Sequence, residues 1–303
     1  MSVQEVLDWA EAIPSEPAFE VRRPSPGLAE AAGLPATPFV FASPHSGRLY
    51  PSDMMPALDE AAIRRSEDAF VDVLAGAGPR YGAPLLQARY ARAYIDVNRE
   101  AYELDQGMFE DELPAFARGR SQRVAAGLGS IARVVAEGQE IYARKLTFAE
   151  AARRIDTVHA PYHAALAALL AEAKARFGFA ILIDWHSMPS AAAAAAARGR
   201  RGCDFVLGDR FGAACSGMIA AVVERELEAM DYAVARNAPY AGGHTTEFYG
   251  RPAEHVHALQ IEINRALYLN ERTLKRHGGF DRLARDLERL VQALTAADWS
   301  KLA

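Results

Sequence analysis

Two histidines and a glutamate draw attention first, because each lies in or just after an apolar segment that predicts a β-strand. They are His45 after Phe39–Ser43, His186 after Phe179–Asp184, and Glu262 within Ala258–Asn264. Ligands bind outside the carboxyl ends of the strands in α/β sheets, so side chains placed in this way can converge. Two imidazoles and a carboxylate are a common ligand set for catalytic zinc, and a further carboxylate serves as general base toward the bound water. For a single histidine at a strand end, a hydrogen-bonded structural role is the alternative.

An acidic ligand is expected soon after His45, and the first predicted helix, Asp59–Ala77, offers three candidates. Glu67, Asp68 and Asp72 lie on or beside the side opposite its apolar stripe. One of them would complete a zinc site. The alternative is a solvated acidic helix face that binds nothing.

Arg99 indicates a binding site for a small carboxylate. It follows the predicted strand Ala93–Val97 and stands directly after Asn98. A guanidinium beside an amide is well suited to hold a carboxylate through paired hydrogen bonds. A structural ion pair between Asp96 and Arg99 is the alternative.

The glycine pair Gly242–Gly243 predicts a loop whose backbone can approach a ligand closely. His244 and Thr245 follow it and supply an imidazole and a hydroxyl for contacts with that ligand. The loop lacks the spacing of phosphate- or dinucleotide-binding motifs. The remaining histidines are expected in structural or surface roles: His159, His163, His255, His257 and His277.

The segments that must position these residues alternate between short apolar strands and long helices rich in Ala, Leu and Arg. Strands are predicted at 39–43, 85–87, 93–97, 179–184, 204–207, 232–236 and 258–264. Helices are predicted at 59–77, 139–177, 211–230 and 271–295. The alternation predicts a sheet with parallel pairs and helices on both faces. Residues 1–37, which include many prolines, are predicted to form an N-terminal arm, and residues 38–303 a single α/β domain.

The composition excludes several classes of protein. The 303 residues are 50% hydrophobic and 24% charged, the balance of a globular protein. A net charge of −5 offers no basic surface for nucleic acid, and no apolar run approaches the roughly 20 residues that cross a bilayer. Residues 1–13 contain acidic and no basic side chains, unlike a secretion signal or transit peptide. The two cysteines, Cys203 and Cys215, predict neither a disulfide framework nor a zinc motif. We expect a cytoplasmic protein, a monomer or a small homo-oligomer, with no nucleic-acid or membrane partner.

The order of several short motifs resembles that of the N-formylglutamate amidohydrolase (formylglutamate deformylase) family, over roughly residues 38–275. The motifs are Ser-Pro-His-Ser-Gly at 43–47, the acidic helix with Asp68, Ile-Asp-Val-Asn-Arg at 95–99, Ile-Asp-Trp-His-Ser-Met-Pro at 183–189, Gly242–Gly243, and 258–265 leading to Tyr268. Each motif is short, but their number and order make the resemblance specific. The chain departs from the family after the acid, where Ala69-Phe70 stands in place of an aromatic–His pair, and in the insert 191–201.

That family is similar in turn to zinc carboxypeptidases, aspartoacylase-like deacylases and peptidoglycan amidases. This wider resemblance implies a three-layer α/β/α, phosphorylase/hydrolase-like fold around a mixed, mostly parallel sheet. It also implies one zinc ion, whose ligands by position are His45, Asp68 (with Glu67 as the alternative acid) and His186. The implied general base is Glu262. The implied substrate contacts are Asn98, Arg99, Gly243, His244 and Thr245.

The resemblance implies hydrolysis of the amide of a small N-acyl amino acid, with N-formyl-L-glutamate as the first candidate. Its products are formate and L-glutamate, at the end of a histidine-degradation route. One alternative is a related zinc deacylase, carboxypeptidase or peptidoglycan amidase-like hydrolase. The other is a non-catalytic binding protein on the same scaffold, which the intact set of ligands and base disfavours.

Overall fold

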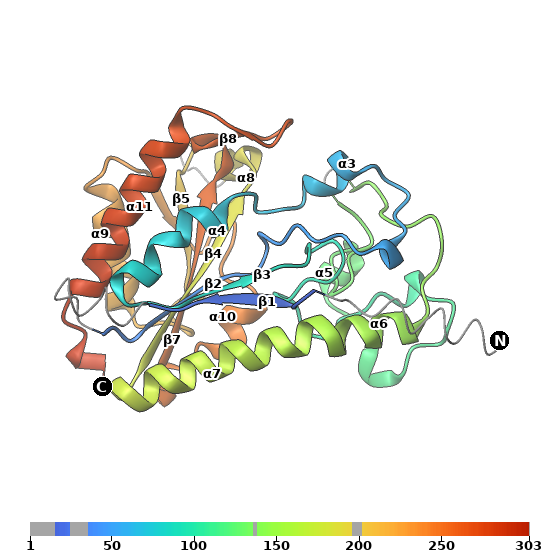
Figure 1. The fold of residues 1–303 in the computed structure, drawn as a ribbon, viewed down its shortest axis with the longest axis horizontal. Coiled ribbons are helices and arrows are strands. Elements are labelled where there is room, and N and C mark those ends of the chain that lie inside the picture. The colour runs from blue at the N-terminus through green and yellow to red at the C-terminus, as the bar shows by residue number, and fades with distance from the viewer. Residues whose placement is uncertain (1–15, 25–35, 136–137, 196–201, 303) are drawn as a thin grey trace. The chain divides into compact units, whose positions relative to one another are not determined.

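The structure, a computed structural model, describes residues 16–24, 36–135, 138–195 and 202–302 (Figure 1). By their contacts the residues group into two compact units that interleave along the chain. Unit 1 contains residues 1–20, 47–67 and 88–164, and unit 2 contains residues 21–46, 68–87 and 165–303. Neither unit is a continuous stretch of chain, so the single domain from residue 38 onward remains a prediction.

A seven-stranded sheet of order β1-β3-β2-β4-β7-β5-β6 has nearly all of its residues in unit 2. The strands are β1 (Phe19–Arg22), β2 (Phe39–Ser43), β3 (Leu85–Ala88), β4 (Ala180–Met188), β5 (Phe205–Gly208), β6 (Val234–Arg236) and β7 (Val256–Asn264). β2 pairs in parallel with β3 and β4, β4 with β7, and β5 with β6, whereas β5 runs antiparallel to β7. The predicted mixed, mostly parallel sheet is therefore confirmed. Part of the predicted N-terminal arm forms β1; residues 1–15 and 25–35 of that arm lie outside the described residues.

One face of the central strands packs into the main apolar core. Alternate side chains of β2, β4, β5 and β7 enter it, among them Phe41, Ile183, Leu207 and Ile261. Three helices cover this face: α4 (Val71–Leu74), α9 (Gly217–Glu228) and α11 (Gly279–Ala296), with α11 against both others (Figure 1). The leucines of α11 at 283, 287, 290 and 294 follow helical spacing and are all buried. Burial of each contributes about 1.5–3 kcal/mol, which explains why this polar-rich segment folds onto the sheet.

The predicted helix 59–77 is wrong as a continuous element. It divides into α3 (Glu60–Arg64), α4 and the 3-10 helix η2 (Ala75–Tyr81). The backbone N–H of Asp68 donates to the carbonyl of His45 (3.0 Å), so it is not available for a helical bond. Phe70 then adopts a left-handed conformation with φ +67° and is the N-cap residue of α4. The acidic residues therefore lie in a break between helices.

The predicted strand Ala93–Val97 is also wrong. The segment forms turns, with the N–H of Tyr94 bonded to the carbonyl of Ala91 (2.9 Å) and that of Asn98 to Asp96 Oδ1 (2.8 Å). Consecutive side chains from 93 to 97 are buried in the apolar core of unit 1 or beside it. Because these side chains are buried on every side, the segment can bury them in turns and need not form a strand with alternating buried and exposed faces.

The other predicted helices are shorter than expected. The region 139–177 contains α6 (Phe148–Arg154), a π-helical turn η6 (Ile155–His159) and α7 (Ala160–Phe177). The region 271–295 begins with a hairpin of β8 (Leu269–Asn270) and β9 (Lys275–Arg276) before α11. The remaining short elements are η1 (Ser52–Met54), η3 (Gln106–Met108), η4 (Ala115–Ala117), α5 (Gln122–Ala125), α8 (Ser190–Ala195), α10 (His244–Tyr249), η7 (Pro252–Glu254), η8 (Arg265–Leu267) and η9 (Ser300–Leu302). The rest of the predicted insert, 196–201, lies outside the described residues. In the described part of the chain, no helix combines the length and the apolar character needed to cross a membrane.

Candidate metal centre

The face of the sheet opposite the main core carries polar side chains on its two central strands. Asp184 and His186 project from β4, and Gln260 and Glu262 from β7. In the parallel register of these strands, Asp184 lies beside Gln260 and His186 beside Glu262. All four side chains are buried. A buried polar cluster of this kind requires mutual hydrogen bonding or a ligand.

His45 and Asp68 reach this cluster from the segments that follow β2 and precede α4. The N–H of Asp68 donates to the carbonyl of His45 (3.0 Å). Ser46 Oγ donates to the carbonyl of Asp68 (3.2 Å) and accepts from the N–H of Asp72 (3.1 Å). These bonds hold the Ser-Pro-His-Ser segment against the start of α4 and place two side chains 23 positions apart next to each other.

Three potential ligand atoms meet at one point. His186 Nδ1 is 3.1 Å from both His45 Nδ1 and Asp68 Oδ2, and the latter two atoms are 3.4 Å apart. Ligands of a tetrahedral zinc at 2.0–2.1 Å are about 3.3–3.4 Å apart, close to these separations. His45, Asp68 and His186, all buried, form the group found among the described residues that could hold a metal ion. The set leaves a fourth tetrahedral position for water or substrate.

The chemistry of the donor set also fits a cation. His186 Nε2 donates to Asp184 Oδ2 (3.0 Å), so in the neutral ring Nδ1 carries the lone pair that a metal ligand needs. Burial would raise the pKa of Asp68, but bonds from His186 and His45 and the charge of Arg265 hold it well below its usual range. Burial would lower the pKa of His186, but Asp184, Asp68 and Glu262 raise it well above its ordinary value. The same carboxylates that favour a positive charge on His186 would also attract a metal cation.

Glu262 is held in a defined orientation beside His186. Gln260 Nε2 donates to Glu262 Oε1 (2.8 Å), and Gln260 Oε1 accepts from the backbone N–H of Gly243 (2.7 Å). The amide of Gln260 therefore links the base candidate to the glycine segment. That segment lies close to the sheet, because a Cβ on Gly208 would come within 2.7 Å of the nitrogen of Gly242.

The predicted loop after the glycine pair is a loop only as far as Gly243. His244 begins α10, and its ring stacks on Phe248 with centroids 5.5 Å apart. Thr245 is buried in the helix. A helix forms here because the Gly243 carbonyl accepts from the N–H of Glu247 (3.1 Å).

Asn98 and Arg99 lie in unit 1, on a turn with many internal bonds. Arg99 Nη1 donates to the carbonyl of Asn98 (2.8 Å), and Nε to that of Leu128 (3.1 Å). Asp96 Oδ2 forms an ion pair with Arg92 Nη2 (2.6 Å), and Asp96 Oδ1 accepts from the N–H of Asn98. The turn is thus rigidly built around the Asn–Arg pair.

His159 and His163 support the same turn. His163 Nε2 donates to the carbonyl of Val97 (2.8 Å), and His159 Nε2 to that of Arg99 (2.9 Å). The two rings lie 4.3 Å apart, because His159 ends the π-helical turn η6 and His163 lies one turn later, in α7. The structural role expected of these two histidines is therefore to support the turn that carries Asn98 and Arg99.

Glu67, the alternative acid, has other partners within unit 1. Its Oε1 accepts from the hydroxyl of Tyr50 (2.6 Å) and from Arg64 Nε (3.1 Å). Asp68, the next residue, faces the two histidines. The geometry therefore favours Asp68 over Glu67 as the acidic ligand.

Four further polar residues contact the predicted site, and sequence reasoning assigned them no role: Asp184, Ser187, Gln260 and Arg265. The sequence contains some indication that these residues belong to the site. Asp184 and Gln260 are two positions before His186 and Glu262, on the same strand faces. Arg265 directly follows a buried strand, where a charge needs a partner.

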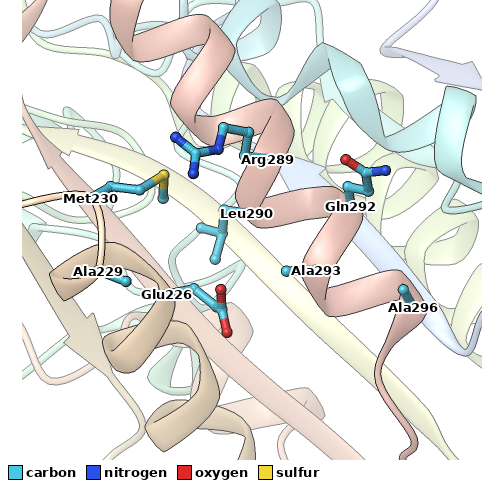
Figure 2. A pocket seen from close by; sticks show the side chains of 8 residues that line it. All are labelled: Glu226, Ala229, Met230, Arg289, Leu290, Gln292, Ala293 and Ala296. Atoms are coloured by element: carbon cyan, nitrogen blue, oxygen red, sulfur yellow. The ribbon is translucent and has the colours of Figure 1, made fainter.

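A separate groove lies between α9 and α11, on the helical side of unit 2 (Figure 2). It is lined by the apolar residues Met230, Leu290 and Ala293 and by the charged residues Glu226 and Arg289. These helices cover the opposite face of the sheet from the histidines. The groove is therefore distinct from the candidate metal centre.

Several known proteins are similar to this chain in sequence and in fold. The sequence profile of the N-formylglutamate amidohydrolase family matches residues 37–269. A Pseudomonas aeruginosa protein named N-formylglutamate deformylase is 31% identical over 238 residues, covering 77% of this chain and 83% of that protein. The protein of the same name from Pseudomonas putida is 29% identical, covering 77% of this chain and 82% of its own.

A solved structure agrees with this result. The crystal structure of N-formylglutamate amidohydrolase from Ralstonia eutropha JMP134 superposes with a TM-score of 0.85 at 39% sequence identity. The superposition covers 92% of this chain and 98% of that one. The polar face of the sheet thus belongs to a hydrolase, and the chain is a member of the N-formylglutamate amidohydrolase family.

Proposed function

We propose that this hydrolase is a metal-dependent, most simply zinc-dependent, enzyme that converts N-formyl-L-glutamate and water into formate and L-glutamate. The observation that carries the proposal is the convergence of His45, Asp68 and His186, with ligand atoms 3.1–3.4 Å apart, beside the carboxylate of Glu262. The relatives named as N-formylglutamate deformylases support the choice of substrate. When bound, zinc supplies polarisation of the formyl carbonyl and a lower pKa for a coordinated water.

The chain's own residues would act as follows. His45, Asp68 and His186 hold the ion, and Asp184 keeps the proton of His186 on Nε2. Glu262 accepts a proton from the attacking water and delivers it to the amide nitrogen as the C–N bond breaks. The departing groups are formate and the amine of glutamate, so atoms and protons balance.

Recognition of the substrate is assigned to two regions. Asn98 and Arg99 hold a substrate carboxylate, which the rigid support of their turn favours. Gly243, His244 and Thr245 contact the remainder. The proposal also includes a cytoplasmic location and a place at the end of a histidine-degradation route.

A panel of substrates tests the proposal on the purified protein. N-formyl-L-glutamate, N-formyl amino acids with other side chains, N-acetyl-L-glutamate and short peptides are compared by kcat/KM, with metal content measured on the same sample. We expect about one bound divalent ion per chain and the highest kcat/KM for N-formyl-L-glutamate. A protein that prefers peptides or N-acetyl substrates would be a related hydrolase of different specificity. A protein that takes up no metal and cleaves none of them would be a binding protein, and the proposal would be wrong.

A further inference from the structure

The oxygen of Asp68 that faces away from the histidines is bound on two sides. Asp68 Oδ1 accepts from Arg265 Nη2 (2.9 Å) and from Ser187 Oγ (3.1 Å). Arg265 Nε donates to the same serine oxygen (3.0 Å). The three side chains form a closed triangle and are buried, with exposed fractions of 1% for Asp68, 6% for Ser187 and 7% for Arg265.

The direction of each bond in this triangle follows from the donors. A guanidinium has no acceptor, so Arg265 must be the donor in both of these bonds. The oxygen of Ser187 accepts from Arg265, and its own proton therefore points to Asp68 Oδ1. Two donors occupy Oδ1, while Oδ2 remains directed at His45 and His186.

A divalent ion and this arginine together would balance the buried carboxylates of the site. Asp68, Asp184 and Glu262 are buried carboxylates in or beside the metal centre. Together they carry three negative charges when ionised, and a divalent ion supplies two positive ones. Arg265 supplies the third. Buried charge is costly unless it is compensated, so the arginine completes an electrically neutral site.

We propose that Arg265 and Ser187 are positioning residues that make Asp68 a ligand through one oxygen only. They hold Oδ1 out of the coordination sphere, present Oδ2 to the ion, and offset the third carboxylate charge. The inference rests on the proposed function in one respect, that a divalent metal binds at His45, Asp68 and His186.

Metal affinity measured on three variants and a control tests the inference. Zinc dissociation constants are measured by competition with a chromogenic chelator for the wild type, Arg265→Met, Arg265→Lys and Ser187→Ala. Removing a residue that orients a metal ligand weakens metal binding about 10–100-fold, and we expect this for Arg265→Met. Arg265→Lys should recover part of the affinity, because it restores the charge but not the two-pronged geometry. Arg236→Met is the control, since Arg236 makes a similar paired contact with Glu224 between β6 and α9.

Cobalt substitution gives a readout that is independent of activity. Tetrahedral Co²⁺ absorbs visible light more strongly than five- or six-coordinate Co²⁺. If Arg265 keeps Oδ1 away from the ion, Arg265→Met lets Asp68 bind through both oxygens, and the absorption per bound cobalt falls. Arg236→Met should retain the wild-type spectrum.

The outcomes separate this inference from the proposed function. Wild-type zinc affinity and an unchanged cobalt spectrum in Arg265→Met would overturn the inference and leave the proposed function standing. A lower thermal midpoint of the metal-free variant with unchanged affinity would likewise make Arg265 a purely structural residue. A wild type that binds no divalent metal would refute the proposed function itself. If Arg265→Met does not fold, Ser187→Ala decides, because it removes one bond to Oδ1 without changing charge; wild-type affinity in it would overturn the inference.

Discussion

Replacing Glu262 by glutamine isolates its part in proton transfer. The side chain is 7% exposed, and its Oε1 accepts the 2.8 Å bond from Gln260. A glutamine has nearly the same volume and keeps an oxygen that can accept that bond. Glu262→Gln should therefore keep the position of the side chain while removing its capacity to take a proton.

The expected loss follows from this separation of position and basicity. A positioned acid–base group contributes about 10²–10⁴-fold to rate, so kcat should fall by at least 10²-fold, or about 2.7 kcal/mol in activation free energy. Zinc content should not change, because the proposed ligand atoms belong to His45, Asp68 and His186. The thermal midpoint of the metal-free protein should stay equal or rise, since one of three neighbouring buried carboxylates is gone.

Steady-state kinetics on N-formyl-L-glutamate and metal analysis of the same preparation check both expectations. Glu254→Gln, which changes an exposed glutamate of the same unit, is the matched control and should behave as wild type. A kcat within tenfold of wild type would place the base elsewhere. Loss of zinc in Glu262→Gln would make Glu262 a ligand and leave the site without an assigned base.

Three further predictions concern other parts of the molecule. Asp184→Asn should weaken zinc binding about 10–100-fold in a chelator competition, because an amide can donate to His186 Nε2 and move the ring proton to Nδ1; unchanged affinity would contradict this. Arg99→Ala should cost about 2–5 kcal/mol on substrates with a free α-carboxylate and little on their amides. If the acid-to-amide ratio of kcat/KM stays constant while the thermal midpoint falls, Arg99 is structural. Leu287→Ala, in the core, should lower the free energy of unfolding by about 2–5 kcal/mol in denaturant titrations. Phe211→Ser, at an 81% exposed position, should change it by about 0.5 kcal/mol or less. Equal effects of the two would contradict the assigned packing.

Several elements follow from the chain's local pattern. The runs at 39–43, 204–207 and 258–264 are apolar or alternate strictly, and each forms a strand within a residue or two of its predicted ends. Such runs are bounded by turn residues and can bury their side chains in only a few ways. Glu262 alternates with apolar neighbours, so the sequence alone placed it on the polar face of a buried strand, whereas His186 was expected just after a strand and lies within β4.

Other features depend on contacts between distant segments, and the local pattern was misleading there. The stretch 59–77 has helical periodicity throughout, yet the carbonyl of His45 takes the N–H of Asp68 and breaks the helix. The stretch 93–97 is mostly apolar, as in a buried strand, but it forms turns that the Asp96 side chain and burial on all sides stabilise. In both cases a tertiary hydrogen bond or packing contact outweighs a local preference.

The sequence by itself indicated a mixed α/β protein of a recognisable family, with two histidines just after predicted strands and a glutamate within another. Only the tertiary structure distinguishes Glu67 from Asp68, which have the same chemistry and adjacent positions. Glu67 turns to Tyr50 and Arg64, and Asp68 to two histidines and Arg265. The physical reason is that periodicity is a local property, which indicates only which side of an element is buried. The candidate metal centre instead depends on contacts between side chains 118 and 197 positions apart in the sequence.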